Sequence, residues 1–162
     1  MNPHAAKFLK LIKHQIKYRM FLFYKLPAAF FSGVRIIDAD ETKSKVSVPF
    51  KWITQNPFRS TYFASLAMAA ELSTGVLAMT HTYKRKPPIS MLVTKMEANY
   101  FKKATGKTIF VCEEGKQISD IIEEIILTRE SKNITVRSVG KNKDGELIAE
   151  FFFTWSFKMK QF

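Results

Sequence analysis

The residue of this sequence with the clearest chemical potential is Glu71. It is the only carboxylate between Arg59 and His81, in a stretch made mostly of Ala, Leu, Met, Phe, Tyr and small hydroxyl residues. A carboxylate in apolar surroundings is costly unless it is paired, and such groups are common at functional sites. The structural alternative is a buried acid that accepts hydrogen bonds from Ser73, Thr74 or a neighbouring strand.

The positions that share a helix face with Glu71 favour the functional reading. Residues three, four and seven positions away are mostly small, so a ligand or another part of the protein can approach the carboxylate closely. They are Ala64, Ala67, Met68, Thr74, Gly75 and Ala78. The alternative to a ligand is a packed strand.

A long helix is needed to carry Glu71. Asn56 can act as its N-cap and Pro57 suits its first position, so the sequence predicts a helix over 57–80. The segment is apolar around its whole circumference, which is typical of a helix buried on all sides. A membrane span over 60–80 is the alternative, and the charge of Glu71 near its centre disfavours it.

Size and composition indicate one domain without disulfides. A chain of 162 residues can bury about two thirds of its unfolded surface, and it has a single cysteine, Cys112. No signal peptide is evident, because lysines repeatedly interrupt the early apolar residues. We therefore expect a cytoplasmic protein with a basic amphipathic helix over 1–25 and a single domain over 26–162.

The positive charge is concentrated at the N-terminus. The formal net charge is +12, and residues 1–25 contain six Lys and Arg and no Asp or Glu. Apolar residues recur there at helical spacing: Phe8, Leu11, Ile12, Ile16, Met20 and Phe23. The predicted helix either packs on the domain body or docks on a membrane surface or partner protein. The charge itself favours an anionic partner of some kind.

The remainder alternates between strands and helices. After a connector at 26–31, strands are predicted at 33–39, 43–49, 89–103, 108–113, 133–140 and 146–158, with a second amphipathic helix over 118–130. Asp120 and Glu123 resemble a capping box, and Asp144-Gly145 favours a hairpin. The order predicts an α+β fold in which an antiparallel sheet of about six strands curls around the long helix. A homodimer would cover the apolar surface left open.

This series of segments resembles the hotdog-fold acyl-CoA thioesterases, and within them a poorly characterised thioesterase-like group. The resemblance covers about residues 26–158. It is carried by the connector with Pro27, the hairpin over 33–49, the helix start from Asn56 through Tyr62-Phe63-Ala64 to Glu71, the strand over 98–106 and the closing segment over 143–149. No single segment is specific, but their order and spacing follow the family.

The resemblance also identifies a departure at the helix start. In phenylacetyl-CoA-type members, Asn precedes the helix, His-Gly-Gly follows six residues later, and an acid lies nine residues after the His. Asn56 and Glu71 match, whereas Tyr62, Phe63 and Ala64 replace the His-Gly-Gly. The family glycines let helix amides approach the thioester oxygen, so these side chains put catalysis in doubt.

The family chemistry would need no cofactor other than the coenzyme A of the substrate. The resemblance implies that Glu71 acts as general base or nucleophile, while Asn56 and the helix amides bind the oxyanion. The Tyr62 hydroxyl could replace the His as a donor. Capping alone also explains Asn56, and a tyrosine such as Tyr62 is often a core or interface residue. The family builds this site across two subunits, so a homodimer or a tetramer is implied.

Basic residues near the predicted site could bind a coenzyme A phosphate or an acidic carrier protein. They are Lys102, Lys103 and the cluster over 84–86, although a charge run is usually a solvated face. His4, His14 and His81 have no metal-ligand spacing with Cys112, so we expect no metal site. Phosphate-binding glycine loops and nucleic-acid reader motifs are absent, so we expect no nucleic-acid partner.

The sequence leaves three functions open. The first is hydrolysis of a fatty-acyl or aryl thioester by Glu71. The second is a non-catalytic acyl-thioester or lipid-binding protein, in which Phe63 and Ala64 have replaced the glycines. The third is an adaptor that contacts a membrane or carrier protein through residues 1–25.

Overall fold

The computed structural model of this chain describes residues 2–160. Its helices are α1 (Ala5–Lys13), α2 (Gln15–Lys25), α3 (Pro27–Ser32), α4 (Phe63–Thr82) and α5 (Gly115–Thr128), with a short 3-10 turn at Trp52–Thr54. Its strands are β1 (Arg35–Ala39), β2 (Ser44–Val48), β3 (Ile89–Tyr100), β4 (Thr108–Cys112), β5 (Lys132–Lys141) and β6 (Leu147–Met159). All six predicted strands are present, with ends shifted by a few residues.

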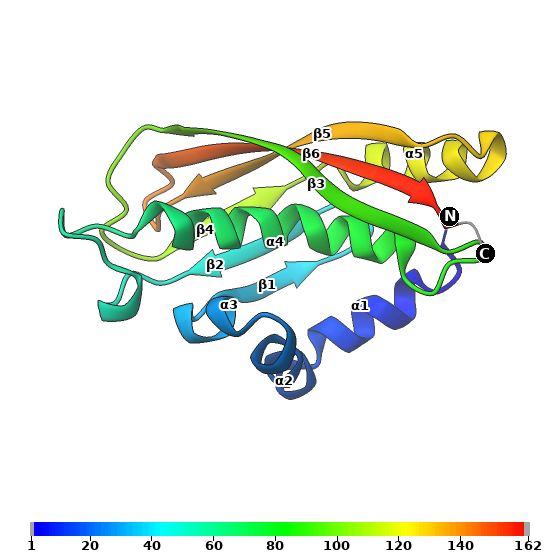
Figure 1. Cartoon of the computed structure of the whole chain (residues 1–162). Coiled ribbons are helices and arrows are strands. Elements are labelled where there is room, and N and C mark those ends of the chain that lie inside the picture. Colours follow the sequence, from blue (N-terminus) through cyan, green and yellow to red (C-terminus); the bar gives the residue numbers. More distant parts are fainter. Residues whose placement is uncertain (1, 161–162) are drawn as a thin grey trace.

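The six strands form one antiparallel sheet in the order β1-β2-β4-β5-β6-β3. The sheet curls around α4, as Figure 1 shows, and α5 packs beside α4 near one end. β1 and β3 are the edge strands. The predicted hairpin at Asp144-Gly145 is confirmed, because Gly145 has a φ of +80° between β5 and β6. The predicted α+β architecture is therefore correct.

The core lies between α4 and the inner face of the sheet. Leu77 and Val76 of α4 are fully buried, as are the aromatic rings of Phe110 and Phe151 from the sheet. Phe110 pairs in register with Gly140, where a β-carbon would lie only 2.4 Å from the ring. Close packing of this kind leaves no room for an added methyl group.

Small hydroxyl residues on α4 are buried without an energetic penalty. The Ser73 hydroxyl lies 2.7 Å from that of Ser138 on β5 and donates to the Ala70 carbonyl. The Ser44 hydroxyl of β2 donates to the Ser73 carbonyl at 2.7 Å. Because the hydroxyls of Ser73, Thr74, Thr80 and Thr82 all have partners, the sheet can enclose this part of α4.

The predicted single helix over 1–25 is divided into α1 and α2 at His14, whose backbone is extended. The division separates the predicted apolar face into two parts. Phe8 and Ile12 of α1 are buried in the core, whereas Ile16, Met20 and Phe23 of α2 are exposed. Tyr18 and Leu22 provide the buried face of α2 instead. The connector predicted over 26–31 is also helical and forms α3.

The predicted start of the central helix at Asn56 and Pro57 is wrong. The Asn56 side-chain oxygen accepts hydrogen bonds from the amides of Phe58 (3.0 Å) and Ser60 (3.2 Å), which closes a turn rather than a helix. Arg59 has a φ of +58°, outside the helical region. α4 begins at Phe63, with Tyr62 as the N-cap residue.

Two further local predictions are wrong. α5 begins at Gly115, so Asp120 and Glu123 both lie inside the helix and form no capping box. Arg85, expected in a solvated cluster, has only 9% of its surface exposed because its guanidinium is paired with Glu123. In both cases, packing against neighbouring elements outweighs the local sequence signal.

α4 is long and apolar enough to cross a membrane, judged by length and composition alone. It is the only such helix within residues 2–160, with a mean hydropathy of 1.4. Two thirds of it (67%) are buried inside the fold. The structure therefore uses α4 as the core helix of a globular domain, as predicted.

The burial of α4 makes a testable stability prediction. Leu77→Ala removes a side chain that is 0% exposed, and we expect it to lower the free energy of unfolding by about 2–5 kcal/mol because it leaves a cavity. Urea unfolding followed by circular dichroism measures this change. The matched control is Leu127→Ala, because Leu127 is 83% exposed. Equal losses in the two variants would contradict this account of the core.

Candidate functional site

Glu71 lies in the middle of α4 and lines a pocket of about 300 Å³, which we call the Glu71 pocket. Its walls come from α2, α4, β3 and β6. The lining residues are Phe21, Lys25, Leu26, Glu71, Leu72, Gly75, Met79, Met91 and Trp155. Apart from Glu71 and Lys25, these residues are apolar or glycine. The pocket can therefore hold an apolar group against a carboxylate.

The Glu71 carboxylate has no hydrogen-bond or ion-pair partner within residues 2–160. The two neighbouring hydroxyls proposed as structural partners are engaged elsewhere. Ser73 bonds to Ala70 and Ser138, and Thr74 donates to the Glu71 backbone carbonyl and accepts from the Trp155 indole at 3.0 Å. Partial burial without compensation raises the pKa of Glu71 above its ordinary value.

Gly75 keeps the space beside this carboxylate open. It lies one turn after Glu71 on α4, and a β-carbon there would lie 3.2 Å from Glu71 Oε1 and 3.6 Å from the Trp155 ring. A larger residue would therefore press the carboxylate and the indole apart. The small-residue face predicted from the sequence contributes here to the wall of a pocket.

Tyr18 of α2 is a neighbour of Glu71 that the sequence did not identify. Burial, and to a smaller extent the charge of Glu71, raises the pKa of Tyr18 above its ordinary value. The side chain is 7% exposed, and its hydroxyl has no hydrogen-bond partner within the described part of the chain. Its ring stacks on Phe21, which lines the Glu71 pocket. The only feature of the sequence that could have identified Tyr18 is its four-residue spacing from Leu22. This spacing predicts that both residues share the buried side of a helix, but it does not predict that Glu71 is near.

A second pocket lies at the start of α4 and has a volume of about 680 Å³. We call it the helix-start pocket. It brings together five of the seven predicted site residues: Asn56, Tyr62, Phe63, Lys102 and Lys103. Tyr100 and Phe101 at the end of β3 add further aromatic surface. Ala64 is half-buried in the first turn of α4 and does not line the pocket.

The structure does not bring Glu71 into the helix-start pocket. Glu71 follows Tyr62 by nine residues, which is about 13 Å along a helix axis. The Glu71 pocket and the helix-start pocket therefore lie at different levels of α4 in one chain. A single thioester group cannot contact both within one protomer.

Some polar groups of the helix-start pocket have partners within the protein, and others have none in the described chain. Tyr62 and Phe63 are about half exposed, with ring centroids 4.8 Å apart. Lys102 is paired with Glu146, whereas Lys103 makes no ion pair within residues 2–160. The backbone amides of Phe63 and Ala64 have no protein acceptor in the described chain, since they begin α4 and the helix has no side-chain cap.

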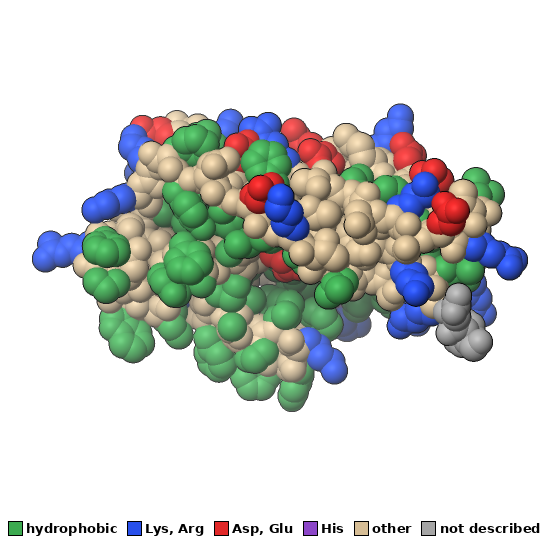
Figure 2. Space-filling view, turned by 45° about the horizontal axis from the view of Figure 1, so that its top comes forward, with side chains coloured by type: hydrophobic (Ala, Val, Ile, Leu, Met, Phe, Trp, Pro, Cys, Tyr) green, Lys and Arg blue, Asp and Glu red, His purple; other side chains and the backbone are tan. Residues whose placement is uncertain are grey.

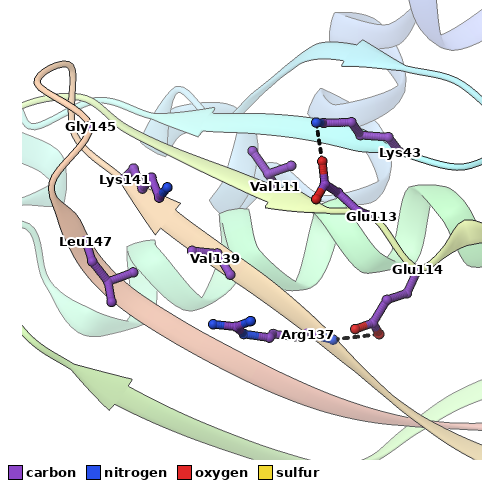
Figure 3. A pocket seen from close by; sticks show the side chains of 9 residues that line it. All are labelled: Lys43, Val111, Glu113, Glu114, Arg137, Val139, Lys141, Gly145 and Leu147. Carbon is purple, nitrogen blue, oxygen red and sulfur yellow. Dashed lines mark hydrogen bonds and ion pairs between the residues drawn. The ribbon is translucent and has the colours of Figure 1, made fainter.

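A third pocket, of about 660 Å³, lies on the outer face of the sheet and was not predicted. Figure 3 shows two contacts among its residues: an ion pair between Lys43 and Glu113, and a hydrogen bond from the Arg137 backbone amide to the Glu114 carboxylate, 3.0 Å long. The Arg137 guanidinium is itself paired with Glu150. These pairs balance most of the charge, so the pocket offers little to attract an anionic ligand.

The Cys112 and His81 side chains are both buried. No group of three or more His, Cys, Asp or Glu that could hold a metal ion occurs in the described residues. Burial raises the pKa of the Cys112 thiol to about 12, so it stays protonated at neutral pH. Burial also lowers the pKa of His81, whose Nε2 lies 2.9 Å from the Glu41 carbonyl.

Solved structures that resemble this chain share its whole fold. PA5026 from Pseudomonas aeruginosa, described as a probable thioesterase of unknown function, is 18% identical, with a TM-score of 0.76 over 90% of this chain and 96% of that one. Thioesterase HI1161 from Haemophilus influenzae is 13% identical, with a TM-score of 0.64 over 89% and 90%. Thioesterase PA1618 from Pseudomonas aeruginosa is 12% identical, with a TM-score of 0.66 over 88% and 94%.

These likenesses show that the chain has the hotdog fold, here in the form found in thioesterase-like proteins. A family model matches residues 18–157, and the chain therefore belongs to the family of the domain of unknown function DUF4442. A search of curated proteins found no match. The resemblance seen in the sequence is thus confirmed at the level of family and fold.

The unpaired carboxylate makes a prediction about pH and stability. Because its pKa is raised in the folded state, the folded protein binds this proton more tightly than the unfolded chain. The contribution of Glu71 to the free energy of unfolding therefore falls as the pH rises from the ordinary glutamate pKa through the raised pKa of the folded state. At pH values above this raised pKa, Glu71 is ionised in both states and destabilises the folded protein to the full extent.

We expect Glu71→Gln to raise the free energy of unfolding at neutral pH, since it removes a half-buried charge that has no partner within the described residues. The gain should shrink toward pH about 4, where both states of the wild type become protonated. Urea titrations across this range measure it, with the exposed Glu130→Gln as control. A gain of the same size at all pH values would show that the charge of Glu71 is not responsible.

Proposed function

We propose that this protein is a thioesterase that hydrolyses a fatty-acyl or aryl thioester of coenzyme A or of an acyl carrier, with Glu71 as general base or nucleophile. The observation that carries the proposal is the unpaired, half-buried carboxylate of Glu71 at an apolar pocket on the central helix of a hotdog fold. The fold is also that of proteins named as thioesterases, which agrees with the proposal.

The environment of Glu71 suits a catalytic carboxylate. In the general-base route, Glu71 takes a proton from water as that water adds to the thioester carbonyl. Collapse of the tetrahedral intermediate then breaks the carbon–sulfur bond, and the thiolate leaves and takes up a proton. A raised pKa brings the base closer to neutral pH, where proton transfer is most effective. The apolar walls of the Glu71 pocket would hold the acyl group.

The oxyanion would be held at the helix-start pocket. The free amides of Phe63 and Ala64 lie at the positive end of the α4 dipole, and the Tyr62 hydroxyl and Asn56 amide are near them. Because Tyr62 and the amides of Phe63 and Ala64 lie about 10 to 13 Å from Glu71 along the helix axis, the proposed site combines Glu71 of one protomer with the helix-start pocket of its partner. Lys102 and Lys103 would then meet the phosphates of coenzyme A.

A homodimer, or a tetramer built from dimers, is therefore part of the proposal. β3 is an edge strand of twelve residues with one side unpaired. Its side chains include the exposed Leu92 (65%), Met96 (45%) and Tyr100 (48%). A long exposed edge with apolar side chains pairs readily with another copy of itself. Pairing through β3 would bring the two β3 ends, and the helix-start pockets beside them, close to the interface.

The activity prediction compares Glu71→Gln with the wild type on a panel of acyl-CoA and aryl-CoA thioesters, measured by release of free thiol. We expect kcat/KM to fall at least about 100-fold, because the general base is lost. Glu130→Gln, at an exposed position, should retain the wild-type rate. Equal rates for Glu71→Gln and the wild type would remove Glu71 from the mechanism.

The dimer prediction concerns the β3 edge. We expect Leu92→Asp combined with Met96→Asp to weaken self-association at least about tenfold, since opposed aspartates would repel across the strand pair. Analytical ultracentrifugation measures this change. Leu127→Asp, at a more exposed position on α5, is the control. A wild-type protein that remains monomeric would contradict a site shared by two protomers.

A non-catalytic acyl-thioester or lipid-binding role is the second candidate. The Phe63 side chain, packed against Tyr62, stands where the resemblance to phenylacetyl-CoA-type thioesterases places a glycine, and this observation favours binding without turnover. Native mass spectrometry distinguishes the two roles. A retained acyl ligand with no thiol release from any substrate would support the binding role and exclude the enzyme.

A further inference from the structure

The outward face of α2 is apolar, although it lies on the surface. Ile16 (73% exposed), Met20 (49%), Phe23 (43%) and Tyr24 (70%) point away from the core, opposite the buried Tyr18 and Leu22. At 3.6 residues per turn, these four share one side of the helix. A surface helix normally has polar residues on its outward side. α2 instead has apolar residues both on its buried side and on this outward side.

α3 extends this face. The Phe23 ring meets those of Phe30 at 5.2 Å and Phe31 at 6.2 Å, and Phe31 is 53% exposed. A groove of about 470 Å³ runs along the face, lined by Gln15, Ile16, Arg19, Met20, Phe23 and Phe30. Figure 2 shows hydrophobic side chains gathered on the lobe that these helices form at the lower edge of the molecule. We call this surface the α2–α3 face.

Basic side chains border the α2–α3 face. Lys17 and Lys25 are exposed, and the Arg19 guanidinium lies 4.1 Å above the Phe30 ring. Residues 1–25 contain no acid at all. Lys13 has a salt bridge to Asp38 at 3.5 Å, but Lys7, Lys10, Lys17 and Lys25 have no acidic partner within the described residues. The charge of this surface is thus left uncompensated by the protein.

We infer that the α2–α3 face docks on an anionic lipid bilayer. Apolar and aromatic side chains on one side of a helix, bordered by lysine and arginine, match the two layers of a bilayer surface: acyl chains below and charged headgroups around them. Ile16, Met20, Phe23 and Phe31 enter the acyl region. Lys17, Arg19 and Lys25 meet the lipid phosphates.

The charge distribution selects this occupant over a second copy of the chain. A twofold contact through the α2–α3 face would place its basic residues against the same basic residues of the other copy, in a protein whose net charge is already +12. Like charges brought together in this way oppose association. Docking on lipid uses the outer side of α2, whereas the inner side lines the Glu71 pocket, and Lys25 is the one residue that the two surfaces share.

The test is co-sedimentation of the full chain with vesicles of phosphatidylcholine alone and with vesicles that also contain phosphatidylglycerol. We expect binding to the anionic vesicles, little binding to the neutral ones, and loss of binding at high salt. Ile16→Ser combined with Tyr24→Ser should weaken binding at least about tenfold, as should Lys17→Gln combined with Lys25→Gln.

Matched controls change residues of the same types elsewhere on the surface. Leu127→Ser removes a hydrophobic side chain on α5 that is 83% exposed, and Lys116→Gln with Lys143→Gln removes two exposed charges. Both controls should bind as the wild type. Absence of wild-type binding to anionic vesicles, or equal losses in test and control variants, overturns the inference. So does a smaller oligomer of Ile16→Ser/Tyr24→Ser with unchanged vesicle binding, which would identify an interface between copies.

Discussion

The structure depends on one constraint: a twenty-residue helix that is apolar on all sides must be enclosed by the rest of the chain. A flat sheet covers one side of a helix, so the sheet has to curl, and α1, α2 and α3 help to cover the side that the strands leave open. Glu71 is the only Asp, Glu, Lys or Arg residue of α4, and it is half-buried at the edge of the region that the sheet and the N-terminal helices enclose.

The N-terminal helices complete both the core and the candidate site. α1 contributes Phe8 and Ile12 to the core, and α2 contributes Tyr18 and Leu22. The same α2 places Phe21 and Lys25 in the wall of the Glu71 pocket and turns its remaining apolar residues to solvent. One helix therefore links the core, the pocket and the α2–α3 face, and its three sides have three different environments.

The sequence predicted the elements that have a periodic pattern and missed those decided by three-dimensional contacts. The strands and α4 follow from alternation and continuous apolarity, and Glu71 is a candidate because it is the only carboxylate in an apolar stretch. The false start at Asn56 arose because an N-cap and a turn use the same side-chain oxygen. Tyr18 could not be linked to Glu71, because their proximity depends on the break at His14, which separates the two parts of an apparently continuous helical pattern.

The two tryptophans of the chain stand in opposite environments. Trp155 is 4% exposed, lines the Glu71 pocket and donates its indole N–H to Thr74 of α4, whereas Trp52 is 83% exposed. Their emission should therefore separate into a blue component from the apolar interior and a red component from water. Filling of the cavity by an acyl group would shift the blue component, so the protein carries its own optical reporter of occupancy.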